Sequence, residues 1–280
     1  MTPFTLNIRG KLVSYDRPVV MGIVNVTPDS FFEGSRCPDD AAIAASVAKM
    51  IADGANMIDI GGYSSRPGAA DVTPEQEAER LSRGVKIARA IAPDTPISVD
   101  TFRASIARQA ITEWGADIIN DISGGNLDPD MYDTVADLNA PYILMHMRGK
   151  PADMQEYAKY DDVTADVLSE LGDRLQQLAL RGVSDIIIDP GFGFSKTTDH
   201  NYRLMAQLAT FRLLHRPILV GISRKSMLTK PLGITPDTAL NATTAANVIA
   251  LDRGADILRV HDVKEARQAV EIYSLTAAQS

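Results

Sequence analysis

The feature that most constrains the fold is a local pattern that repeats along the chain, a glycine followed by a short apolar run that ends in polar residues. Four segments share it, at residues 54–62, 115–124, 182–191 and 254–262. In each one the glycine follows an amphipathic stretch, where a left-handed residue commonly ends a helix. The apolar run lacks polar alternation, which is typical of a strand that is covered on both faces within a parallel sheet.

Four further apolar tracts lie at residues 19–26, 97–99, 141–145 and 217–222. Together with the four segments above, they raise the expected number of strands to eight. Helical patterns separate the strands, at residues 40–52, 73–92, 104–114, 131–138, 163–180, 201–214, 235–251 and 264–273. Strict alternation of strand and helix favours an α/β fold, and eight such units have the size of a (β/α)8 TIM barrel. Local patterns do not show whether the sheet closes, so a doubly wound open sheet is the structural alternative.

The chain shows no internal linker or low-complexity tract, so we expect a single domain over residues 1–280. The leading segment, residues 4–15, places Gly10 and Lys11 between two apolar stretches. We expect this segment to form a short N-terminal β-hairpin that caps the bottom of the barrel.

Composition excludes several classes of partner. The 280 residues carry a formal net charge of -8, so a broad positive field for nucleic acid or for acidic membranes is absent. No apolar stretch approaches the length of a membrane span, and the first residues do not resemble a signal peptide. The single cysteine, Cys37, cannot form an internal disulfide, which suits a reducing compartment. We therefore expect a cytoplasmic protein that binds neither nucleic acid nor membrane.

Polar residues stand at the C-terminal ends of all the expected strands. They are Asn25, Asp59, Asp100, Asn120, His146, Asp189, Arg224, and Arg259 with His261. In a barrel these ends surround one mouth, where the loops after the strands build active sites. Buried polar groups are costly unless they pair with one another or with a ligand, so the set predicts a functional site. Single members are weaker evidence, because Asp59 could cap a turn and His146 could be a hydrogen-bonded core histidine.

These residues fall into two chemical classes. Carboxylates and an amide could hold a flat, nitrogen-rich heterocycle such as a 2-amino-4-oxo pyrimidine ring, since one carboxylate can accept two adjacent N–H donors. These residues are Asp59, Asp100, Asp189 and Asn120. Cationic groups of the strands and loops could clamp a phosphate or diphosphate, and they are Arg66, Lys225, Arg259 and His261. Phe194 could pack against an aromatic substrate or simply beneath its own loop.

Short motifs follow one another in a fixed order between Pro18 and Ile272. They read GIVNVTPDSF at 22–31, DIGG at 59–62, SRPGA at 65–69, SVDT at 98–101, IND at 119–121, LMHMRG at 144–149, DPGFGF at 189–194, GISRKS at 221–226 and RVHDV at 259–263. In content and order these motifs closely resemble the dihydropteroate synthase family. Because that family is built on a (β/α)8 barrel, the resemblance implies that the sheet closes.

The resemblance also implies roles for individual residues. The pterin ring would be held deep in the barrel by Asp100, Asn120, Met145, Asp189 and Lys225. The diphosphate would be bound by Asn25, Arg66, Arg259 and His261. The p-aminobenzoate site would be formed by Ser65, Pro67, Phe194 and Ser226. Asn25 would also help to place a Mg2+ ion, alongside an aspartate of the first loop that we match to Asp29 or leave unassigned.

The reaction that the resemblance implies is a group transfer in folate biosynthesis. It joins 6-hydroxymethyl-7,8-dihydropterin pyrophosphate to p-aminobenzoate and yields 7,8-dihydropteroate and pyrophosphate. Because the ring can stabilise the cation left when the Mg2+-bound pyrophosphate departs, we expect ionisation before attack, with Asp100, Lys225 and Arg259 as catalytic residues. Asp100 and Asp189, kept ionised, would favour the cationic pterin. The resemblance further suggests a homodimer formed through the outer helices.

The chain departs from the usual family pattern at three positions. Tyr63 stands where the family usually has an acidic residue, Ser65 replaces a threonine, and Ser195 stands where glycine is common. Ser65 keeps the hydroxyl group of the threonine. We expect these changes to alter affinity and inhibitor response more than the type of reaction.

Two other functions are compatible with a pterin-binding barrel. A methyltetrahydrofolate:corrinoid methyltransferase would share Asp100, Asn120 and Asp189, but it needs no cationic clamp for a diphosphate. The chain could also be a barrel that binds pterins without catalysis. Release of pyrophosphate on addition of p-aminobenzoate would separate these functions from the first.

Overall fold

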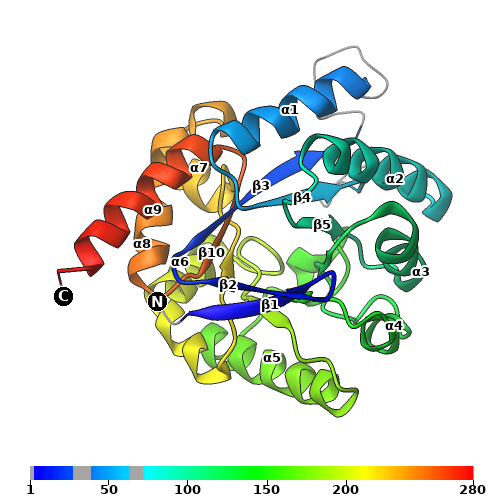
Figure 1. Ribbon diagram of the computed structural model, residues 1–280. Helices are drawn as coiled ribbons and strands as arrows, with labels where there is room; N and C mark the ends of the chain where they lie inside the picture. The colour runs from blue at the N-terminus through cyan, green and yellow to red at the C-terminus, as the bar shows by residue number, and fades with distance from the viewer. Residues whose placement is uncertain (1–2, 28–38, 64–71, 280) are drawn as a thin grey trace.

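The computed structural model describes residues 3–27, 39–63 and 72–279 of the chain, which form a ring of parallel strands surrounded by helices (Figure 1). Its strands are β3 (Val19–Asn25), β4 (Met57–Gly61), β5 (Ile97–Asp100), β6 (Ile118–Asp121), β7 (Tyr142–Met145), β8 (Ile186–Asp189), β9 (Leu219–Val220) and β10 (Ile257–Val260). Each lies within a segment that the sequence predicts to hold a strand, except that β5 extends one residue beyond the predicted tract 97–99.

The sheet closes on itself. Its strands follow the order β8-β7-β6-β5-β4-β3-β10-β9, in which neighbours along the chain are neighbours in space. A parallel bridge between Ile188 and Ile218 joins the two ends of this order. The closure confirms the predicted (β/α)8 barrel and excludes the doubly wound alternative.

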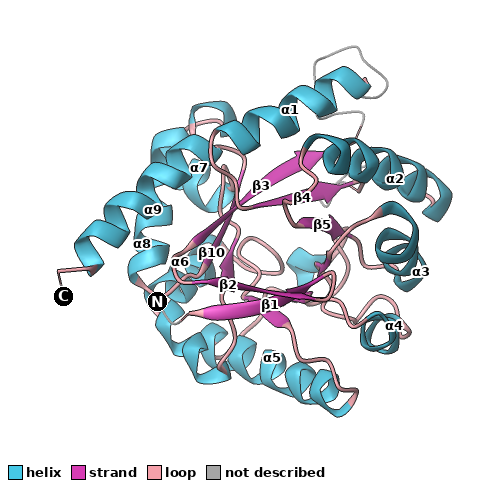
Figure 2. Cartoon of the chain, viewed as in Figure 1, coloured by secondary structure: helices cyan, strands magenta, loops and turns pink. Residues whose placement is uncertain are grey.

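Helices cover the outside of the barrel (Figure 2). They are α1 (Asp40–Ala52), α2 (Pro74–Ile91), α3 (Ala104–Gln109), α4 (Met131–Leu138), α5 (Val163–Leu180), α6 (Thr198–Ala206), α7 (Ser226–Leu232), α8 (Leu240–Asp252) and α9 (Val263–Ala277). A π-helical turn at Ala110–Trp114 follows α3, and 3-10 turns lie at Met154–Tyr157, Leu208–Leu214 and Pro236–Thr238. No described helix is long and apolar enough to cross a lipid bilayer.

The expected helices are confirmed in outline, with corrections at their ends. The stretch predicted from residue 235 begins as a 3-10 turn, and α8 itself starts only at Leu240. Helix α7 was not predicted, because it has seven residues, contains Pro231 and ends at the left-handed Gly233. Short helices of this kind leave little periodicity in a sequence.

Alternation along the strands divides the barrel interior into two layers. The lower layer is apolar and consists of Val19, Met21, Met57, Ile118, Ile143, Ile187, Leu219 and Ile257. Residues of the opposite parity, such as Val20, Ile58 and Ile119, belong to the core between strands and helices. Two residues further along most strands, the inward positions are polar. The barrel is therefore apolar below and polar towards its mouth.

The predicted N-terminal hairpin is confirmed. Strands β1 (Phe4–Ile8) and β2 (Lys11–Tyr15) pair antiparallel, and Figure 1 shows them lying across one opening of the barrel. Leu6 and Ile8 pack against the lower apolar layer. The backbone N–H of Asn7 donates to the Asp185 carboxylate at 2.7 Å. The hairpin thus closes the end of the barrel opposite the polar layer.

Candidate active site

Several strands bring charged or amide side chains into the upper interior, where they bind one another. Arg259 on β10 donates from Nε to Asp59 Oδ2 at 2.7 Å and from Nη2 to Asp100 Oδ2 at 2.9 Å. Asn120 on β6 donates from Nδ2 to the same Asp59 oxygen at 3.1 Å. The second Asp59 oxygen, Oδ1, is buried and has no hydrogen-bond partner among the described residues. One guanidinium therefore joins two carboxylates, and acceptor capacity remains.

Lys225 and Asp189 bring a second pair of opposite charges to the part of the mouth above β8 and β9. Lys225 donates from Nζ to the Phe192 carbonyl oxygen at 2.6 Å, and its ammonium lies 4.6 Å from the ring centroid of Phe194. Asp189 accepts the Gly191 N–H at 2.7 Å. Burial lowers the pKa of Lys225 to about 8, against the opposing charge of Asp189. Lys225 thus links the buried carboxylates to the loop that carries Phe194.

Two carboxyl groups of the mouth, those of Asp100 and Asp189, hold their protons more tightly than exposed ones. Burial raises the pKa of Asp100 to about 7, although the charge of Arg259 opposes this shift. Burial also raises the pKa of Asp189, which Lys225 opposes. Burial acts to lower the pKa of Arg259, but Asp59 and Asp100 outweigh it and the pKa is raised. The ionised carboxylates expected from the sequence therefore depend on nearby cations or on a bound ligand.

The residues expected to bind a diphosphate lie around this cluster in different settings. His261 is exposed at the rim, with Nδ1 3.0 Å from the Ser223 hydroxyl. Asn25 ends β3 and lies over Gly61, where an added Cβ would come within 3.1 Å of the Asn25 Oδ1 atom. Arg259 lies deeper in the mouth than His261 and is held there by the carboxylates of Asp59 and Asp100. A glycine at position 61 therefore leaves room for the carboxamide oxygen of Asn25 in the mouth.

The residues expected to bind p-aminobenzoate are only partly described. Phe194 is half-buried and packs against a small apolar cluster that includes Met145. Ser226 is exposed as the first residue of α7. The remaining expected residues, together with Cys37, lie outside the described residues: Asp29, Ser65, Arg66 and Pro67.

His146 and Arg224 make their contacts outside the mouth. This corrects the expectation that all polar residues at the strand ends surround one mouth. His146 follows Met145 and has the opposite parity, so its buried ring lies between Glu170 on α5 and Lys196. Arg224 makes a bidentate ion pair with Asp262. Of the two interpretations from the sequence, a functional residue or a hydrogen-bonded core histidine, the structure supports the second for His146. Counting in twos from the inward Ile143 already places it on the outer face.

Sequence reasoning also missed Lys196 and Glu170, the partners of His146. Glu170 gave no signal, because it lies inside an ordinary amphipathic helix. Lys196 is 3% exposed, which is rare for a lysine and calls for polar partners. It directly follows the DPGFGF motif and Ser195, so its neighbourhood was the only indication in the sequence.

The structure gives two of the unusual residues local partners. The ring of Tyr63 stands edge-on to Phe102, with ring centroids 5.3 Å apart. Ser195 takes up a left-handed backbone with φ of 47°, which favours the glycine that is common there. Its hydroxyl donates to the Phe194 carbonyl oxygen at 2.8 Å and accepts the Arg148 N–H at 3.0 Å. These hydrogen bonds offset the backbone cost of a serine.

The described residues hold no group of three or more His, Cys, Asp or Glu side chains that could bind a metal ion by themselves. Mg2+ commonly takes one or two protein oxygens and completes its shell with phosphate oxygens and water. The carboxamide oxygen of Asn25, with the space above Gly61, suits such a shared site. The chemistry of the donor set therefore fits an ion that arrives with a phosphorylated ligand.

The fold and this mouth define a (β/α)8 barrel that gathers carboxylates and cations at the C-terminal ends of its strands. The family described as pterin binding enzymes matches residues 21–261. The dihydropteroate synthase of Escherichia coli strain K12 is 41% identical over 272 residues, covering 96% of this chain and 95% of that protein. The chain therefore belongs to the pterin-binding enzyme family and, within it, to the dihydropteroate synthases.

Solved structures agree with this assignment. The dihydropteroate synthase of Xanthomonas albilineans with 4-aminobenzoic acid has a TM-score of 0.91 and 38% identity, and the match covers 99% of both chains. The same enzyme in complex with 7,8-dihydropteroate has a TM-score of 0.87 and 36% identity, covering 98% of this chain and 99% of that one.

Proposed function

We propose that this chain is a transferase of folate biosynthesis that condenses 6-hydroxymethyl-7,8-dihydropterin pyrophosphate with p-aminobenzoate to give 7,8-dihydropteroate and pyrophosphate. The observation that carries the proposal is that groups suited to a pterin ring and a group suited to an aromatic amine lie close together in one mouth. Buried carboxyls joined by Arg259 lie near Lys225, whose ammonium contacts the Phe194 ring. Family membership identifies the ligands that suit these groups.

The pterin ring is assigned to the carboxyl side of the mouth. Asp100 and Asp189 accept N–H donors of the ring, Asn120 supplies an amide, and Met145 packs against a ring face. Lys225 donates to a ring acceptor and touches the second substrate as well. Ligand N–H groups bound to these carboxylates favour their ionised forms, which opposes the rise in pKa caused by burial.

The pyrophosphate is assigned to the rim above the carboxylates. Nε and Nη2 of Arg259 serve Asp59 and Asp100, so Nη1 is the atom that we assign to a pyrophosphate oxygen. His261 and Arg66 complete the cationic set, and Asn25 contributes its carboxamide. A bound Mg2+, held by Asn25 and by substrate oxygens, would supply further neutralisation of the charge on the pyrophosphate.

The reaction is assigned an ionising course. The bond between the pterin CH2 and the pyrophosphate oxygen breaks first, and its electron pair leaves with the pyrophosphate that Arg259 and His261 stabilise. The neutral amine of p-aminobenzoate then attacks the CH2 and afterwards releases one proton to solvent. Phe194 and Ser226 position this amine, so no strong base is required.

The test is a pyrophosphate-release assay with the purified chain. We expect release only when the pterin pyrophosphate, p-aminobenzoate and Mg2+ are all present, together with stoichiometric dihydropteroate measured by mass spectrometry. Tight pterin binding without any release would instead indicate a non-catalytic barrel. Methyl transfer from methyltetrahydrofolate to a corrinoid, with no pyrophosphate release, would indicate the methyltransferase alternative.

We further propose a cytoplasmic homodimer. Apolar side chains are exposed on neighbouring outer helices, with Tyr202 on α6 at 45%, Ile249 on α8 at 49% and Ile272 on α9 at 63%. Tyr202 and Ile249 also line a surface hollow floored by Met227 and Leu228. An apolar hollow with exposed apolar side chains at its edge supports contact with a second copy. Sedimentation equilibrium should give twice the mass of one chain, and a single-chain mass at all concentrations would contradict the dimer.

A further inference from the structure

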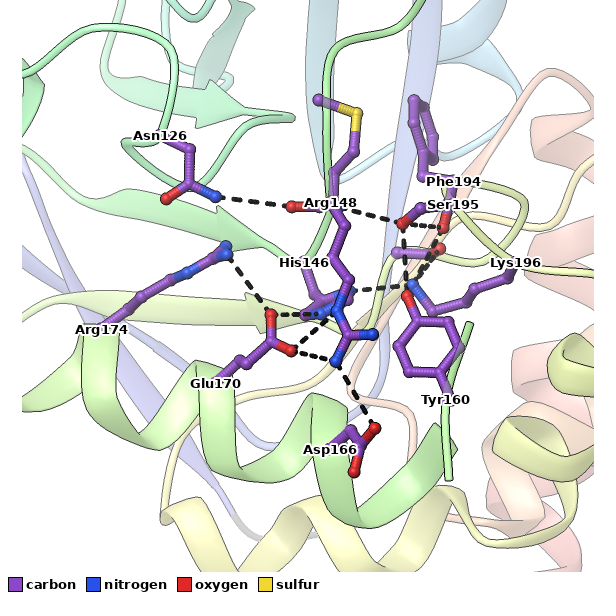
Figure 3. Close-up of polar contacts among 12 residues, drawn as sticks. Asn126, His146, Arg148, Tyr160, Asp166, Glu170, Arg174, Phe194, Ser195 and Lys196 are labelled. Carbon is purple, nitrogen blue, oxygen red and sulfur yellow. Dashed lines mark hydrogen bonds and ion pairs between the residues drawn. The ribbon is translucent and has the colours of Figure 1, made fainter. Parts of the chain in front are cut away.

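A buried ammonium group lies behind the loop that carries Phe194, on the side away from the barrel interior. Lys196 Nζ lies 3.0 Å from His146 Nδ1 and donates to the carbonyl oxygens of Gly191 at 3.0 Å and Phe194 at 3.1 Å. Figure 3 shows Lys196 beside His146, with the Phe194 and Ser195 backbone next to it. All three contacts are directed to the segments that follow β7 and β8.

The electrostatics of this group fix the direction of its hydrogen bonds. Burial, aided by the charge of Lys196, lowers the pKa of His146 to about 3, so the imidazole is neutral near pH 7. Glu170, whose pKa its hydrogen bonds to His146 and Arg148 lower to about 2 despite burial, is ionised and only accepts, so His146 Nε2 carries the proton and Nδ1 accepts. Burial lowers the pKa of Lys196 to about 7, but Nζ faces three acceptors, and only the protonated form has a hydrogen for each of them. Nε2 then donates to Glu170 on α5, at 3.1 Å. The lysine is thereby tied through the imidazole to a helix.

The same helix residue orders the neighbouring loop. Glu170 accepts from Arg148 Nε at 2.9 Å, and the Arg148 guanidinium lies 4.1 Å from the centroid of the Tyr160 ring. The backbone N–H of Arg148 donates to the Ser195 hydroxyl at 3.0 Å. Figure 3 shows these residues joined by dashed lines into one network, in which Lys196 lies next to His146 and Ser195. The network therefore fixes Lys196 relative to α5.

Two lysines hold the loop from opposite sides. Lys225 binds the Phe192 carbonyl oxygen from the barrel interior, at 2.6 Å, while Lys196 binds those of Gly191 and Phe194 from behind. The residues of this loop would not hold its backbone conformation by themselves. Its glycines at 191 and 193 have φ of 72° and 83°, and Ser195 has φ of 47°. A peptide with such dihedrals keeps one geometry only when its surroundings determine it.

We propose that Lys196 is a positioning residue for the p-aminobenzoate half of the site, which acts by fixing Phe194 against Lys225 through the carbonyl oxygens of the loop. The proposal rests on the proposed function, because it takes Phe194 to contact the amine substrate. Lys196 itself touches neither substrate. A buried ammonium is a costly way to fill this space, since an apolar side chain would avoid its desolvation. Its three directed hydrogen bonds supply what an apolar residue lacks.

The main test is a double-mutant cycle on the two Michaelis constants. Lys196→Met should raise the KM for p-aminobenzoate about tenfold, with the KM for the pterin pyrophosphate changed by less than about twofold. Phe194→Leu should show the same selectivity. If Lys196 acts through Phe194, the double variant should be no worse than Phe194→Leu alone, because residues that act as a unit are not additive. Multiplied effects, or equal rises in both constants, would overturn the proposal.

Two further variants control for loss of structure. Lys86→Met makes the same chemical change at an exposed position of α2, and it should leave both constants unchanged. Ser195→Ala removes only one hydroxyl from the same anchor, so it serves if Lys196→Met does not fold. It should raise the KM for p-aminobenzoate about threefold, again selectively, and unchanged constants would contradict the proposal. An inactive wild-type chain would refute the proposed function, whereas normal wild-type kinetics without selectivity would refute only the role of Lys196.

Discussion

The two ends of the barrel both bury pairs of aspartate and arginine, but they use them differently. At the lower end Asp117 accepts the backbone N–H of Ile97 at 2.8 Å and pairs with Arg89 and Arg9. Its carboxylate thus ties two neighbouring strands to α2 and to the N-terminal hairpin. The Ile97 N–H and Arg89 serve its Oδ2 atom, and its Oδ1 atom, which makes no hydrogen bond within the described residues, lies 3.0 Å from Arg9 Nε. This is the arrangement expected of a stabilising pair.

At the mouth the partners are side chains that a ligand can replace or supplement. Asp59 accepts only from Arg259 and Asn120 within the described residues, and its Oδ1 atom has no hydrogen bond there. Asp100 has a pKa raised to about 7 by burial, despite Arg259. One carboxylate oxygen of Asp59 and one of Asp117 lack a hydrogen bond within the described residues, so the comparison teaches that the two ends differ in the kind of partner. Asp117 is served by a backbone N–H and by arginines of α2 and the hairpin, whereas Asp59 is served only by the side chains of Arg259 and Asn120. The mouth, where side chains alone serve Asp59, is the end to which we assign the substrates.

The largest effect should come from the lower end. Asp117→Ala leaves Arg89 without its buried partner and also removes the acceptor of the Ile97 N–H. We expect the free energy of unfolding to fall by about 3–5 kcal/mol, the range for breaking a buried pair. Urea denaturation followed by circular dichroism measures this change. The KM values of the folded fraction should stay normal, and a selective loss of pterin binding would contradict the division between the two ends.

Removing a mouth residue should affect activity more than stability. Asp189→Ala and Lys225→Ala each remove a charged contact assigned to the pterin, so we expect kcat/KM to fall about 100-fold with loss of pterin binding. Steady-state kinetics with the pterin pyrophosphate as the varied substrate give this value. Equal kcat/KM for wild type and Asp189→Ala would show that the assignment is wrong.

Arg259→Ala should act mainly on turnover. In the proposed mechanism the guanidinium stabilises charge that grows as the pyrophosphate leaves, so kcat should drop about 30-fold while the KM for the pterin changes less. A matched variant, Arg212→Ala, removes an arginine that pairs with Asp256 at the lower end, 3.0 Å away. It should lower stability and leave kcat unchanged. A kcat that falls equally in both variants would remove the distinction between the ends.

The smallest effect should be a dependence on pH. In the proposed site Asp100 must be ionised to accept a ring N–H. Burial raises its pKa to about 7, so kcat/KM should fall up to about tenfold per unit as pH drops below 7. Asp100→Asn should flatten this limb of the profile. An unchanged acidic limb in Asp100→Asn would assign it to another group.

The same pKa shift predicts a change in stability with the opposite sign. Because the folded state holds the Asp100 proton more tightly than the ordinary value of 3.8 allows, this group stabilises the fold fully below that pH. The contribution is lost as pH rises through about 7. Wild type should therefore lose stability relative to Asp100→Asn between pH 4 and 7, which thermal unfolding across that range measures.

Much of the fold could be predicted because its causes are local. The β-branched runs such as 186–188 have no polar alternation, and glycines such as Gly254 end the preceding helices, so the strands and most helices followed. Closure of the ring was beyond local pattern and came from the family resemblance. Helix α7 was missed because Pro231 and its short length hide its period.

The site could be predicted less completely, for two physical reasons. Strand-end residues were grouped without regard to parity, which placed His146 with inward residues such as Asp189 although it points the other way. Contacts through space left no trace in spacing. Glu170 and Lys196 lie 24 and 50 residues from His146 along the chain, and only folding brings them to the same ring.

The most direct test of the central claim is calorimetric binding of a pterin to three proteins: wild type, Asp189→Asn and Asp117→Asn. The account predicts that wild type and Asp117→Asn bind with equal affinity, while Asp189→Asn binds at least about tenfold more weakly despite unchanged stability. Weakened binding by Asp117→Asn together with normal binding by Asp189→Asn would contradict the account.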